Sequence, residues 1–454
     1  MRSLRDCRLQ QGWFLFGIIV ALSTLSVAAQ QPTPMAAADT SAAPLTLTLQ
    51  DAVARAHANE PQYRAALTDY GLARQNTTQA RAALLPNVSY NGQFLYTQGN
   101  GTSTGRYIGS NGVHEYISEG NAHESLSLGN AATFRQAQAQ EALAKAKSEI
   151  AARGLVVTVV QAYYALVVAQ RKFATAQRAA GEAGHFFDIT QKLEHGGEVA
   201  HSDSIKAQLQ QQQQQRALQD AELEMERSRL ELAVLIFPTF NENFSTVDDL
   251  DNLEPLPSYQ EVEVAAGTNS PQLRVALASL RAANQEVAVS WNGLLPSLGM
   301  DYFYGIDANH YAVNGIDPVS GRQVKNLGYA ATATLQLPLW NWGASRSKIK
   351  QADLQRNQAK VELSFAQRKA AADLRLFYQE AQTSRSEMES LRQSADLASE
   401  SLRLTNLRYQ AGEATVLEVV DAQNTLTLAQ NSLADGQQRF RVALANLQTL
   451  TGNF

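Results

Sequence analysis

The sequence contains almost no cysteine, which limits the sites it can form. Its 454 residues include a single thiol, Cys7. Cys7 precedes an apolar run from Trp13 to Leu25, and three arginines precede that run, as in a secretory signal. Val27-Ala28-Ala29 then offers small residues for cleavage. We interpret residues 1–29 as a signal peptide rather than a permanent membrane anchor, so the mature chain has no thiol for a disulfide or a metal.

Charge and aromatic residues are also scarce. Charged residues make up 18% of the chain and aromatic residues 7%, and the formal net charge is −5 at pH 7. A negative balance of this kind excludes the electrostatic footprint of a nucleic-acid-binding protein. Ala, Gln, Leu and Ser dominate instead, a composition typical of long helices with small side chains rather than of a layered α/β core.

Long hydrophobic runs and catalytic motifs are missing as well. After the signal, no segment approaches the 18 uninterrupted apolar residues of a membrane helix, so any membrane span of the mature chain must consist of β-strands. No nucleophile–base pair, phosphate loop or metal constellation appears, which predicts neither an enzyme nor a cofactor. His195 and His201 lie close in sequence but lack a third ligand, and we expect them to be solvated.

The chain contains an internal repeat at an offset of about 210 residues. The segment 59–86 aligns without a gap to 269–296, with 11 of 28 pairs identical, both prolines in register and Leu-Leu-Pro at the end of each copy. We therefore divide the chain into a first repeat and a second repeat. The predicted order is signal 1–29, flexible leader 30–46, first repeat 47–237, a Pro-, Asn- and Asp-rich connecting segment 238–258, and second repeat 259–454.

After each Leu-Leu-Pro the helical pattern changes to alternation of apolar and polar residues. Proline ends a helix and is tolerated where a strand begins. Each alternating run is followed by a Gly/Ser/Asn-rich stretch, at 99–114 and 308–325, and then by a return strand. A soluble hairpin with one face on a core is the alternative to a transmembrane hairpin. The apolar positions are Val88, Tyr90, Phe94 and Tyr96, then Ala122, Leu126 and Leu128 against a same-parity Glu124, then Leu298, Met300, Tyr302, Tyr304 and Ile306, and last Leu327, Tyr329, Ala331, Ala333, Leu335 and Leu337.

Four strands in one chain cannot close a barrel, and open strand edges are not tolerated in lipid. Three chains of four strands would supply twelve, an even number within the range of outer-membrane barrels. If the strands are transmembrane, closure therefore predicts a trimer. Trp340 and Trp342, after the last strand, suit an interfacial aromatic girdle, with simple packing as the alternative.

Two long proline-free helices are expected at 132–194 and 344–410. About 65 helical residues span on the order of 100 Å. Gln210–Gln215 lies on the helix that returns from the first, where we expect a solvated face. The second long helix carries a coiled-coil seam of mostly small residues, interrupted by Asp373. The seam is formed by Ala366, Ala370, Phe377, Ala381, Met388, Leu391, Ala395, Leu402 and Tyr409.

Each long helix ends at glycine, and the next helix follows at once. Gly196 and Gly197 end the first, and Gly412, before Glu413, ends the second. Glycine adopts the left-handed conformation that terminates helices. Thr415 to Glu418 then has the spacing of a capping box.

Together these features resemble the TolC family of outer-membrane efflux proteins, over essentially the whole mature chain. The resemblance is carried by the doubled Asn-x-Pro…Leu-Leu-Pro, by the strand end Leu337 to Gly343, and by Arg408 to Gly412 followed by Glu418, Asp421, Ala422 and Gln423. The family implies an α+β membrane protein in which a trimeric 12-stranded β-barrel continues into a long α-helical coiled-coil barrel. The first return strand departs from the family pattern, since it ends Ser127-Leu128-Gly129-Asn130.

The resemblance also implies a gate at the periplasmic tip. Glu418 and Asp421 match the family's acidic ring; independently, positions i and i+3 share a helix face, so three chains would gather six carboxylates. An ordinary acidic helix N-terminus is the alternative. Closing contacts in the family join a Ser/Thr-Asp pair to a tyrosine and an arginine. Ser202, Asp203 and Tyr409 match, whereas Ala414 replaces the arginine and Arg408 is a candidate substitute.

We thus predict a passive exit duct of the bacterial outer membrane, with a large periplasmic part, for efflux or type I secretion. Its expected partners are two further copies of the chain, outer-membrane lipid, a periplasmic adaptor at the tip turns (Gly196, Gly197, Gly412, Glu413) and an inner-membrane transporter. The rival from another class is a structural coiled-coil scaffold of the cell envelope, which needs neither strands nor closure. A hydrolase is disfavoured by the missing site.

Overall fold

The computed structural model describes residues 45–96, 114–239, 243–252, 255–308, 310–316 and 320–452. The predicted signal, the leader up to residue 44, and the loop 97–113 lie outside these residues. Pro44–Phe454 forms one compact unit. Its elements are β1 (Leu45–Leu47), α1 (Leu49–Asn59), α2 (Pro61–Ala82), β2 (Asn87–Tyr96), β3 (His114–Leu126), α3 (Leu128–His195), α4 (His201–Ile236), β4 (Phe244–Thr246), α5 (Tyr259–Asn269), α6 (Pro271–Asn292), β5 (Ser297–Ala308), β6 (Asn314–Ile316), β7 (Gln323–Lys325), β8 (Leu327–Gln336), α7 (Ala344–Gln410) and α8 (Val416–Thr451).

The helices of the two halves match in order and nearly in length. α1 and α5 have 11 residues each, α2 and α6 have 22, α3 and α7 have 68 and 67, and α4 and α8 have 36. The local chemistry matches too, because capping boxes at Thr48 and Ser258 begin α1 and α5. Pro61 and Pro271 occupy the first turns of α2 and α6, where proline costs no hydrogen bond.

Four long strands form one antiparallel sheet in the order β2-β3-β5-β8. Each hairpin is internally paired, with Tyr90 opposite Gly120 in the first and Tyr302 opposite Ala331 in the second. β3 and β5 join the hairpins through the register Glu119 opposite Gly305. β2 and β8 are the edges of the sheet, and neither has a second hydrogen-bonded neighbour among the described residues.

The register sorts the side chains of the sheet onto two faces, because successive residues point to opposite sides of a strand. The polar face carries Asn91, Glu119 and Thr332 near its middle. The other face is mainly apolar and aromatic, as predicted, and Glu124 lies on it opposite Met300. That apolar face is formed by Val88, Tyr90, Phe94, Tyr96, Tyr116, Leu126, Leu298, Met300, Tyr302, Tyr304, Ile306, Leu327, Tyr329 and Leu335.

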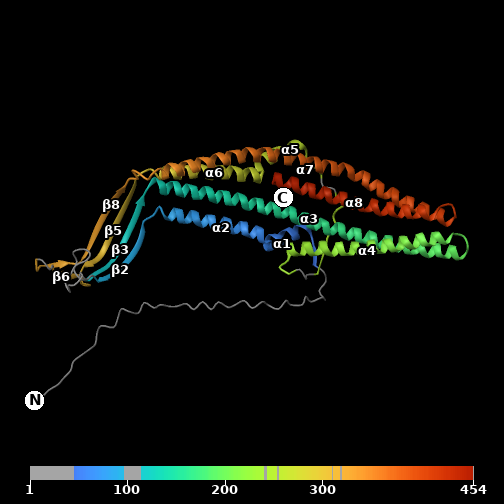
Figure 1. Cartoon of the computed structure of the whole chain (residues 1–454), viewed down its shortest axis with the longest axis horizontal. Coiled ribbons are helices and arrows are strands. Elements are labelled where there is room, and N and C mark those ends of the chain that lie inside the picture. The colour runs from blue at the N-terminus through green and yellow to red at the C-terminus, as the bar shows by residue number, and fades with distance from the viewer. Residues whose placement is uncertain are drawn as a thin grey trace, which may run out of the picture. The chain divides into compact units, whose positions relative to one another are not determined.

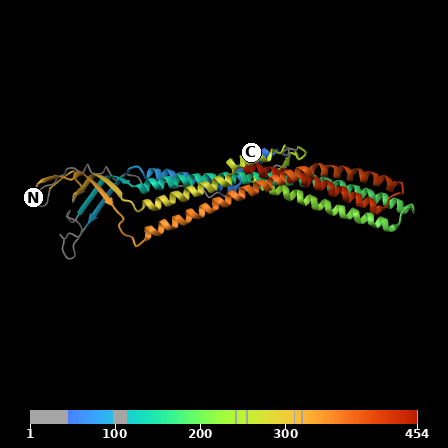
Figure 2. The same cartoon turned by 90° about the horizontal axis from the view of Figure 1, so that it is seen from above.

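The sheet lies at one end of the long helices, and the glycine turns lie at the other (Figure 1). α3 packs against α4, and α7 against α8, as two helical hairpins (Figure 2). The predicted seam of α7 faces its neighbours along its second half, where small and apolar side chains recur at heptad spacing. Its buried members are Ala381, Met388, Ala395, Leu402 and Tyr409.

The largest core cluster surrounds the middle of α3. Among the helices that the structure describes, α3 alone contains a stretch that is apolar enough for a membrane span by length and composition. In the structure this apolar stretch packs on the chain itself: Tyr163, Tyr164 and Val167 are almost fully buried against α1, β1, β4 and the end of α4. About two-fifths of this stretch (39%) is buried, so one face of α3 belongs to the core, and the sequence does not reveal this face as an uninterrupted apolar run.

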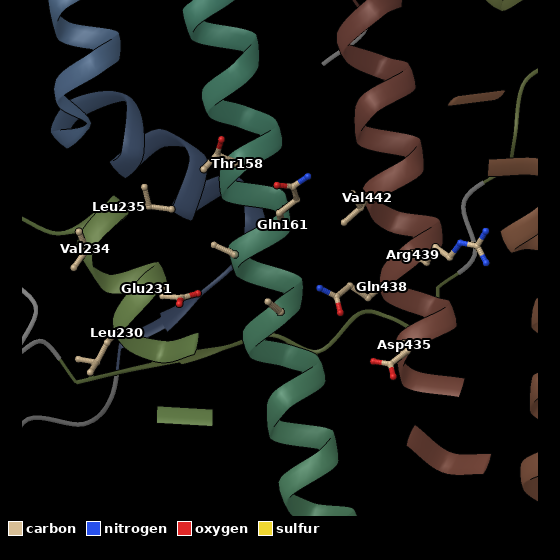
Figure 3. Close-up of a pocket in the computed structure, with 12 residues that line it drawn as sticks. Thr158, Gln161, Leu230, Glu231, Val234, Leu235, Asp435, Gln438, Arg439 and Val442 are labelled. Carbon is tan, nitrogen blue, oxygen red and sulfur yellow. The ribbon is translucent and has the colours of Figure 1, made fainter. Parts of the chain in front are cut away.

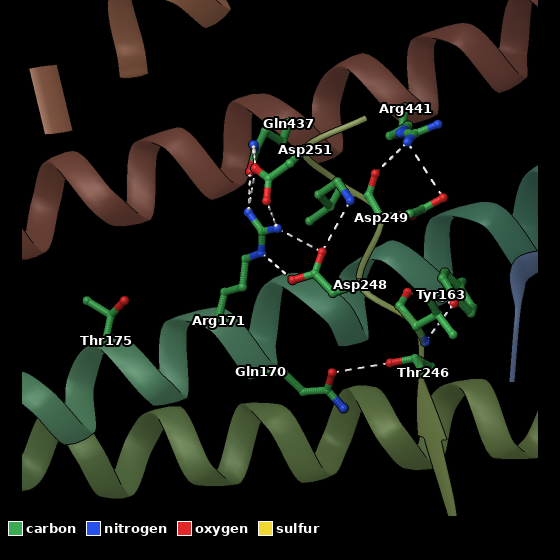
Figure 4. Close-up of polar contacts among 12 residues, drawn as sticks. Tyr163, Gln170, Arg171, Thr175, Thr246, Asp248, Asp249, Asp251, Gln437 and Arg441 are labelled. Atoms are coloured by element: carbon green, nitrogen blue, oxygen red, sulfur yellow. Dashed lines mark hydrogen bonds and ion pairs between the residues drawn. The ribbon is translucent and has the colours of Figure 1, made fainter. Parts of the chain in front are cut away.

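The connecting segment ties the two halves together beside this core (Figure 4). β4 pairs in parallel with β1, so Leu45 and Thr46, which were assigned to the leader, begin the fold. The Arg171 guanidinium of α3 donates to Asp248 and Asp251 at 2.8 and 2.9 Å, and to the Gln437 amide oxygen of α8 at 2.7 Å.

Two buried side chains complete this junction. The guanidinium of Arg441, on α8, donates to the carbonyl oxygens of Asp249 and Asn252 at 2.6 and 2.8 Å. The Tyr163 hydroxyl lies 3.0 Å from the Leu47 carbonyl oxygen and accepts from the Val247 amide at 3.0 Å. Burial raises the pKa of Tyr163 to about 12, so it remains a neutral hydrogen-bonding group. Residues 244–252 are thus a structured clasp rather than a simple linker.

Two strand ends differ from the prediction. The last strand, β8, ends at Gln336, so Leu337 lies just beyond it. The first return strand ends at Leu126, and Leu128 is the first residue of α3 rather than a strand residue. Ser127 caps the helix by accepting the Asn130 amide at 3.0 Å. The prediction failed here because a serine cap replaces the proline that ends the other strand.

Candidate functional site

The two turns at the far end of the helices share one geometry. We call Gly196–Ala200 and Ala411–Thr415 the tip turns. Gly197 and Gly412 have φ of 77° and 75°, the left-handed region that glycine adopts without strain. In each turn the residue after this glycine donates its amide to the carbonyl five residues earlier, Glu198 to Leu193 and Glu413 to Arg408, both at 2.8 Å. These are Schellman ends, which satisfy the last carbonyls of α3 and α7.

α8 begins with the predicted capping box, and this box engages one residue of the expected acidic ring. The Glu418 carboxylate accepts the Thr415 amide at 3.2 Å, while the Thr415 hydroxyl accepts the Glu418 amide at 3.3 Å. These bonds from Thr415, aided by the nearby Arg408 guanidinium at 3.4 Å, lower the pKa of Glu418. Glu418 is therefore an ionised helix cap in the single chain, and the carboxylate of Asp421, one turn later, is exposed.

Tyr409 holds α7 against α3. Its hydroxyl lies 3.1 Å from the Thr190 hydroxyl, which itself donates to the Phe186 carbonyl oxygen at 2.9 Å. The rings of Phe186 and Tyr409 are 5.0 Å apart between centroids. Val416 and Val419 of α8 and Ala207 of α4 complete the cluster, and Ala414 packs against it. Burial raises the pKa of Tyr409, so the hydroxyl keeps its proton.

A polar contact joins α4 to α8 just above this cluster. Gln210 and Gln214 are buried, and their side-chain amides donate to the Asn424 side-chain oxygen at 3.0 and 3.1 Å. The expectation that the whole glutamine run is solvated was therefore wrong for these two residues. Their spacing of four residues places both on the face that meets α8.

The remaining predicted gate residues make local contacts in the single chain. Asp203 is bound by Lys206 one turn away at 3.1 Å, and Ser202 is exposed. Arg408 donates to the Glu413 carbonyl oxygen at 3.1 Å and approaches Glu418, so it joins α7 to α8 rather than one tip turn to the other. The Tyr409 hydroxyl is thus hydrogen-bonded to Thr190, while Asp203 is near enough for its charge to contribute to the raised pKa of Tyr409.

Three of the contacts across the tip were not predicted from the sequence. Thr190 was missed because a threonine within an apolar helix face carries no signal of its own. Gln210, Gln214 and Asn424 were missed because a glutamine run is usually a solvated face.

His201 lies 2.6 Å from the Glu194 carboxylate, and His195 lies 2.7 Å from the Gln191 carbonyl oxygen. Within the described ranges, no group of three His, Cys, Asp or Glu side chains is arranged to hold a metal ion.

A groove of about 880 Å³ lies over α3, between the end of α4 and the middle of α8 (Figure 3). Leu230, Val234 and Leu235 of α4 give it an apolar wall. The wall from α8 is polar, and its Arg439 is bound to Glu387 of α7 at 3.2 Å. No nucleophile with an adjacent base lines this groove, so it offers a surface and not a catalytic centre.

Comparison with known proteins finds one family and several relatives that match most of the chain. The family model described as "Outer membrane efflux protein" matches residues 52–236 and 264–453, one segment in each half. The outer membrane protein TolC of Escherichia coli (strain K12) is 22% identical over 410 residues, covering 88% of this chain and 80% of TolC. The alkaline protease secretion protein AprF of Pseudomonas aeruginosa is 25% identical over 404 residues, covering 87% of this chain and 82% of AprF.

Among solved structures, the CmeC outer membrane channel of Campylobacter jejuni is similar, with a TM-score of 0.76. The sequences are 18% identical, and the superposition covers 89% of this chain and 85% of CmeC. At this identity the structural likeness shows the fold alone.

Proposed function

This chain belongs to the family of outer membrane efflux proteins, and from that premise we propose that three copies form one closed duct through the outer membrane and the periplasm. It is an outer-membrane channel for efflux or secretion, and not an enzyme. The trimer, the closed barrel, the gate and the partners are our proposals. They explain what the strands, the helices and the tip turns do.

The observation that carries the proposal is the pair of unsatisfied sheet edges. β2 and β8 each present a row of backbone groups with no second strand beside them in the described chain. Such edges cannot persist in lipid, where every backbone group needs a partner. If β8 of one copy pairs with β2 of the next, three copies close a barrel of twelve strands, and no edge remains.

The two faces of the sheet agree with this closure. The face with Tyr90, Tyr302 and Tyr329 would contact acyl chains, and all three rings are at least 47% exposed in the single chain. The face with Asn91, Glu119 and Thr332 would line a water-filled lumen. An outer-membrane barrel requires this separation of apolar and polar residues.

Because the two halves of the chain match, three copies would place six similar sets of helices around the duct. We interpret α1–α4 and α5–α8 as two tandem structural repeats, because their elements match in order and nearly in length. Each repeat then contributes one long helix and one return helix to a periplasmic tunnel. In the part of α3 nearest the sheet, residues 128–154, the only buried side chains are the small ones of Ala132, Ala146 and Ser148, which favours packing of this part against neighbouring copies.

We place the gate at the tip turns. Opening requires the two helical hairpins of each copy to separate, and two contacts oppose this within the chain: Tyr409 with Thr190, and Asn424 with the buried glutamines. Asp421, and Glu418 once released from its cap, would form an acidic ring that favours cations. We expect Asp421→Asn to lower cation selectivity, read as a smaller reversal potential in a salt gradient.

The proposed partners are a periplasmic adaptor, which would contact Gly196, Gly197, Gly412 and Glu413, and an inner-membrane transporter. The four tip residues are exposed and stand at the end of the helical body. Crosslinking from cysteines at positions 197 and 412 would identify the adaptor. The choice between efflux and type I secretion follows from the transporter that is captured with it.

The trimeric duct is tested by electrophoresis and bilayer recording. A heat-modifiable trimer in outer-membrane fractions, with stepwise conductance in planar bilayers, is expected. A structural scaffold would give neither, so a monomer without conductance would refute the duct.

A further inference from the structure

All tryptophans of the described chain lie at one level, where the sheet meets the helices. The sequence has four tryptophans, and the first, Trp13, lies in the signal region. Trp291 is in the last turn of α6, shortly before β5 begins. Trp340 and Trp342 stand between the end of β8 and the start of α7. The ends of α6 and β8 and the starts of β5 and α7 come together at this junction (Figure 1).

The three indole rings are largely exposed in the single chain, which is unfavourable in water because the rings are mostly apolar. Trp291 is 56% exposed, Trp340 77% and Trp342 89%. Leu337 and Leu339, close in sequence to Trp340 and Trp342, are 52% and 88% exposed. We call these four side chains, together with Trp291 at the end of the neighbouring helix α6, the apolar patch. Large exposed apolar patches mark interaction surfaces. Tryptophan in particular accumulates where a bilayer meets water, since its ring is apolar and its N–H is polar.

The tryptophan pair is also held in a defined geometry. Trp340 and Trp342 meet edge to face, with ring centroids 5.9 Å apart. Trp342 has a φ of 55°, which is rare for a bulky residue because the left-handed region brings its Cβ close to the backbone carbonyl oxygen. The Ala344 amide donates to the Asn341 carbonyl oxygen at 3.0 Å and fixes the turn around Trp342. A strained turn that displays an indole to solvent is typical of a functional contact.

Positive charge stands directly beside the patch. Arg346 and Lys350 are exposed, lie one turn apart at the start of α7, and have no ion-pair partner among the described residues. The first turn of α7 contains no acidic residue. The helix dipole disfavours cations at this end. An anion above the patch would offset that cost and complement both side chains.

An aromatic girdle at this level is expected of an outer-membrane barrel, and Trp291, Trp340 and Trp342 would insert there at the level of the glycerol backbone in the periplasmic leaflet. We propose that this girdle is also a belt that selects anionic phospholipids, because Arg346 and Lys350 bind the phosphates of their headgroups. The inference rests on the proposed membrane-spanning trimer. It commits to phospholipid because the patch continues the apolar face of the sheet, through Leu335 and Leu337, and adds positive charge where that face ends.

The competing occupant is a neighbouring copy of the chain, since β8 is an edge strand. Fluorescence quenching by brominated phospholipids distinguishes the two. Trimers carrying Trp13→Phe are reconstituted with lipids brominated near the headgroup end or near the methyl end of the acyl chain. We expect strong quenching by the shallow bromines and weaker quenching by the deep ones. Indoles packed against another copy of the chain would be quenched by neither the shallow nor the deep bromines, and that result would overturn the proposal.

Headgroup recognition is tested by comparing brominated anionic with brominated zwitterionic phospholipid. Each basic residue at an anionic surface contributes about 1 kcal/mol, which corresponds to about a fivefold change in relative affinity. We expect the wild-type trimer to prefer the anionic lipid at least fivefold, and Arg346→Gln/Lys350→Gln to lower this preference at least fivefold, with Lys348 left in place. Lys360→Gln/Lys369→Gln is the matched control, because both lysines are exposed on α7 farther from the sheet.

Equal quenching by both headgroups in the wild type would refute the charged part of the belt. Trimer stability and conductance are recorded for every variant. If the trimers are intact and conducting but quenching is absent, the belt fails and the duct stands. If no trimer forms, the proposed function itself fails.

Discussion

The contact between Tyr409 and Thr190 yields the sharpest prediction for the gate. Tyr409→Phe deletes the hydroxyl that lies 3.1 Å from Thr190 and keeps the ring that packs 5.0 Å from Phe186. Thr190 is not orphaned, because it still donates to the Phe186 carbonyl oxygen. The loss is therefore that of one net hydrogen bond, about 1 kcal/mol per chain, or about fivefold in the opening equilibrium. If three chains open together, the effect reaches about 3 kcal/mol.

The assay is single-channel recording of reconstituted trimers. Tyr409→Phe is expected to raise the conductance or the open probability, and Thr190→Val to do the same. Because the two hydroxyls contact each other, the double variant should add little to either single one. Thr158→Val is the control, since Thr158 makes the same bond to its own helix, to the Gly154 carbonyl oxygen, without a tyrosine partner.

Asp203→Ala separates contacts within a chain from contacts between chains. The family resemblance predicts that it too raises conductance, yet within the chain Asp203 is bound by Lys206. The charge of Asp203 disfavours only the ionised form of Tyr409, which stays protonated, so the effects of the two substitutions should be nearly additive. Unchanged conductance of Tyr409→Phe, or effects of Thr190→Val and Tyr409→Phe that sum without coupling, would refute the assignment of this contact to the gate.

Three further predictions concern the sheet, the clasp and the cap. Gly305→Ala should abolish heat-resistant trimers, because the added Cβ would overlap the Ser118 carbonyl oxygen and the Glu119 backbone. Gly328 lies opposite Gly305 on β8 and has open space where a Cβ would be, so Gly328→Ala should leave the trimers intact. Arg171→Met should cost about 2–3 kcal/mol and speed hydrogen exchange in residues 244–252. Lys172→Met removes a single ion pair with Asp435, outside this segment, and should change the exchange little. Because the pKa of Glu418 is lowered, its cap stabilises α8 fully at pH values above the ordinary carboxyl pKa of 4.5, and this stabilisation is lost as the pH falls through the lowered value. Hydrogen exchange at the start of α8 should therefore become faster over that acid range. Glu418→Gln should remove this dependence on pH.

Much of the fold could be predicted because it is determined locally. Prolines, alternation and glycine turns fix where strands and long helices begin and end, and the capping box at Thr415 was correct to the residue. Contacts between segments that lie far apart in the sequence were harder to predict. A serine cap moved Leu128 from strand to helix, and the pairing of β4 with β1 turned an expected linker into a clasp.

The candidate site was predictable only in part, for a similar reason. Gly197 and Gly412 carry their own conformational signal, so the tip turns were found. Thr190 and Asn424 act through partners on helices more than 200 residues away in sequence, and no spacing rule joins them. The roles of Glu418, Asp421, Asp203 and Ser202 depend on neighbouring copies, and they stay predictions.

Closure of the sheet between copies is the central claim, and disulfide trapping tests it most directly. In one chain β2 and β8 are separated by β3 and β5, so they lie about 14 Å apart, beyond the reach of a disulfide. With Cys7 replaced by serine, cysteine pairs scanned along β2 and β8 have no other thiol to react with. We predict that at least one register gives covalent trimers, with no larger species. Monomers at every register, or an open ladder of higher oligomers, would contradict the closed duct.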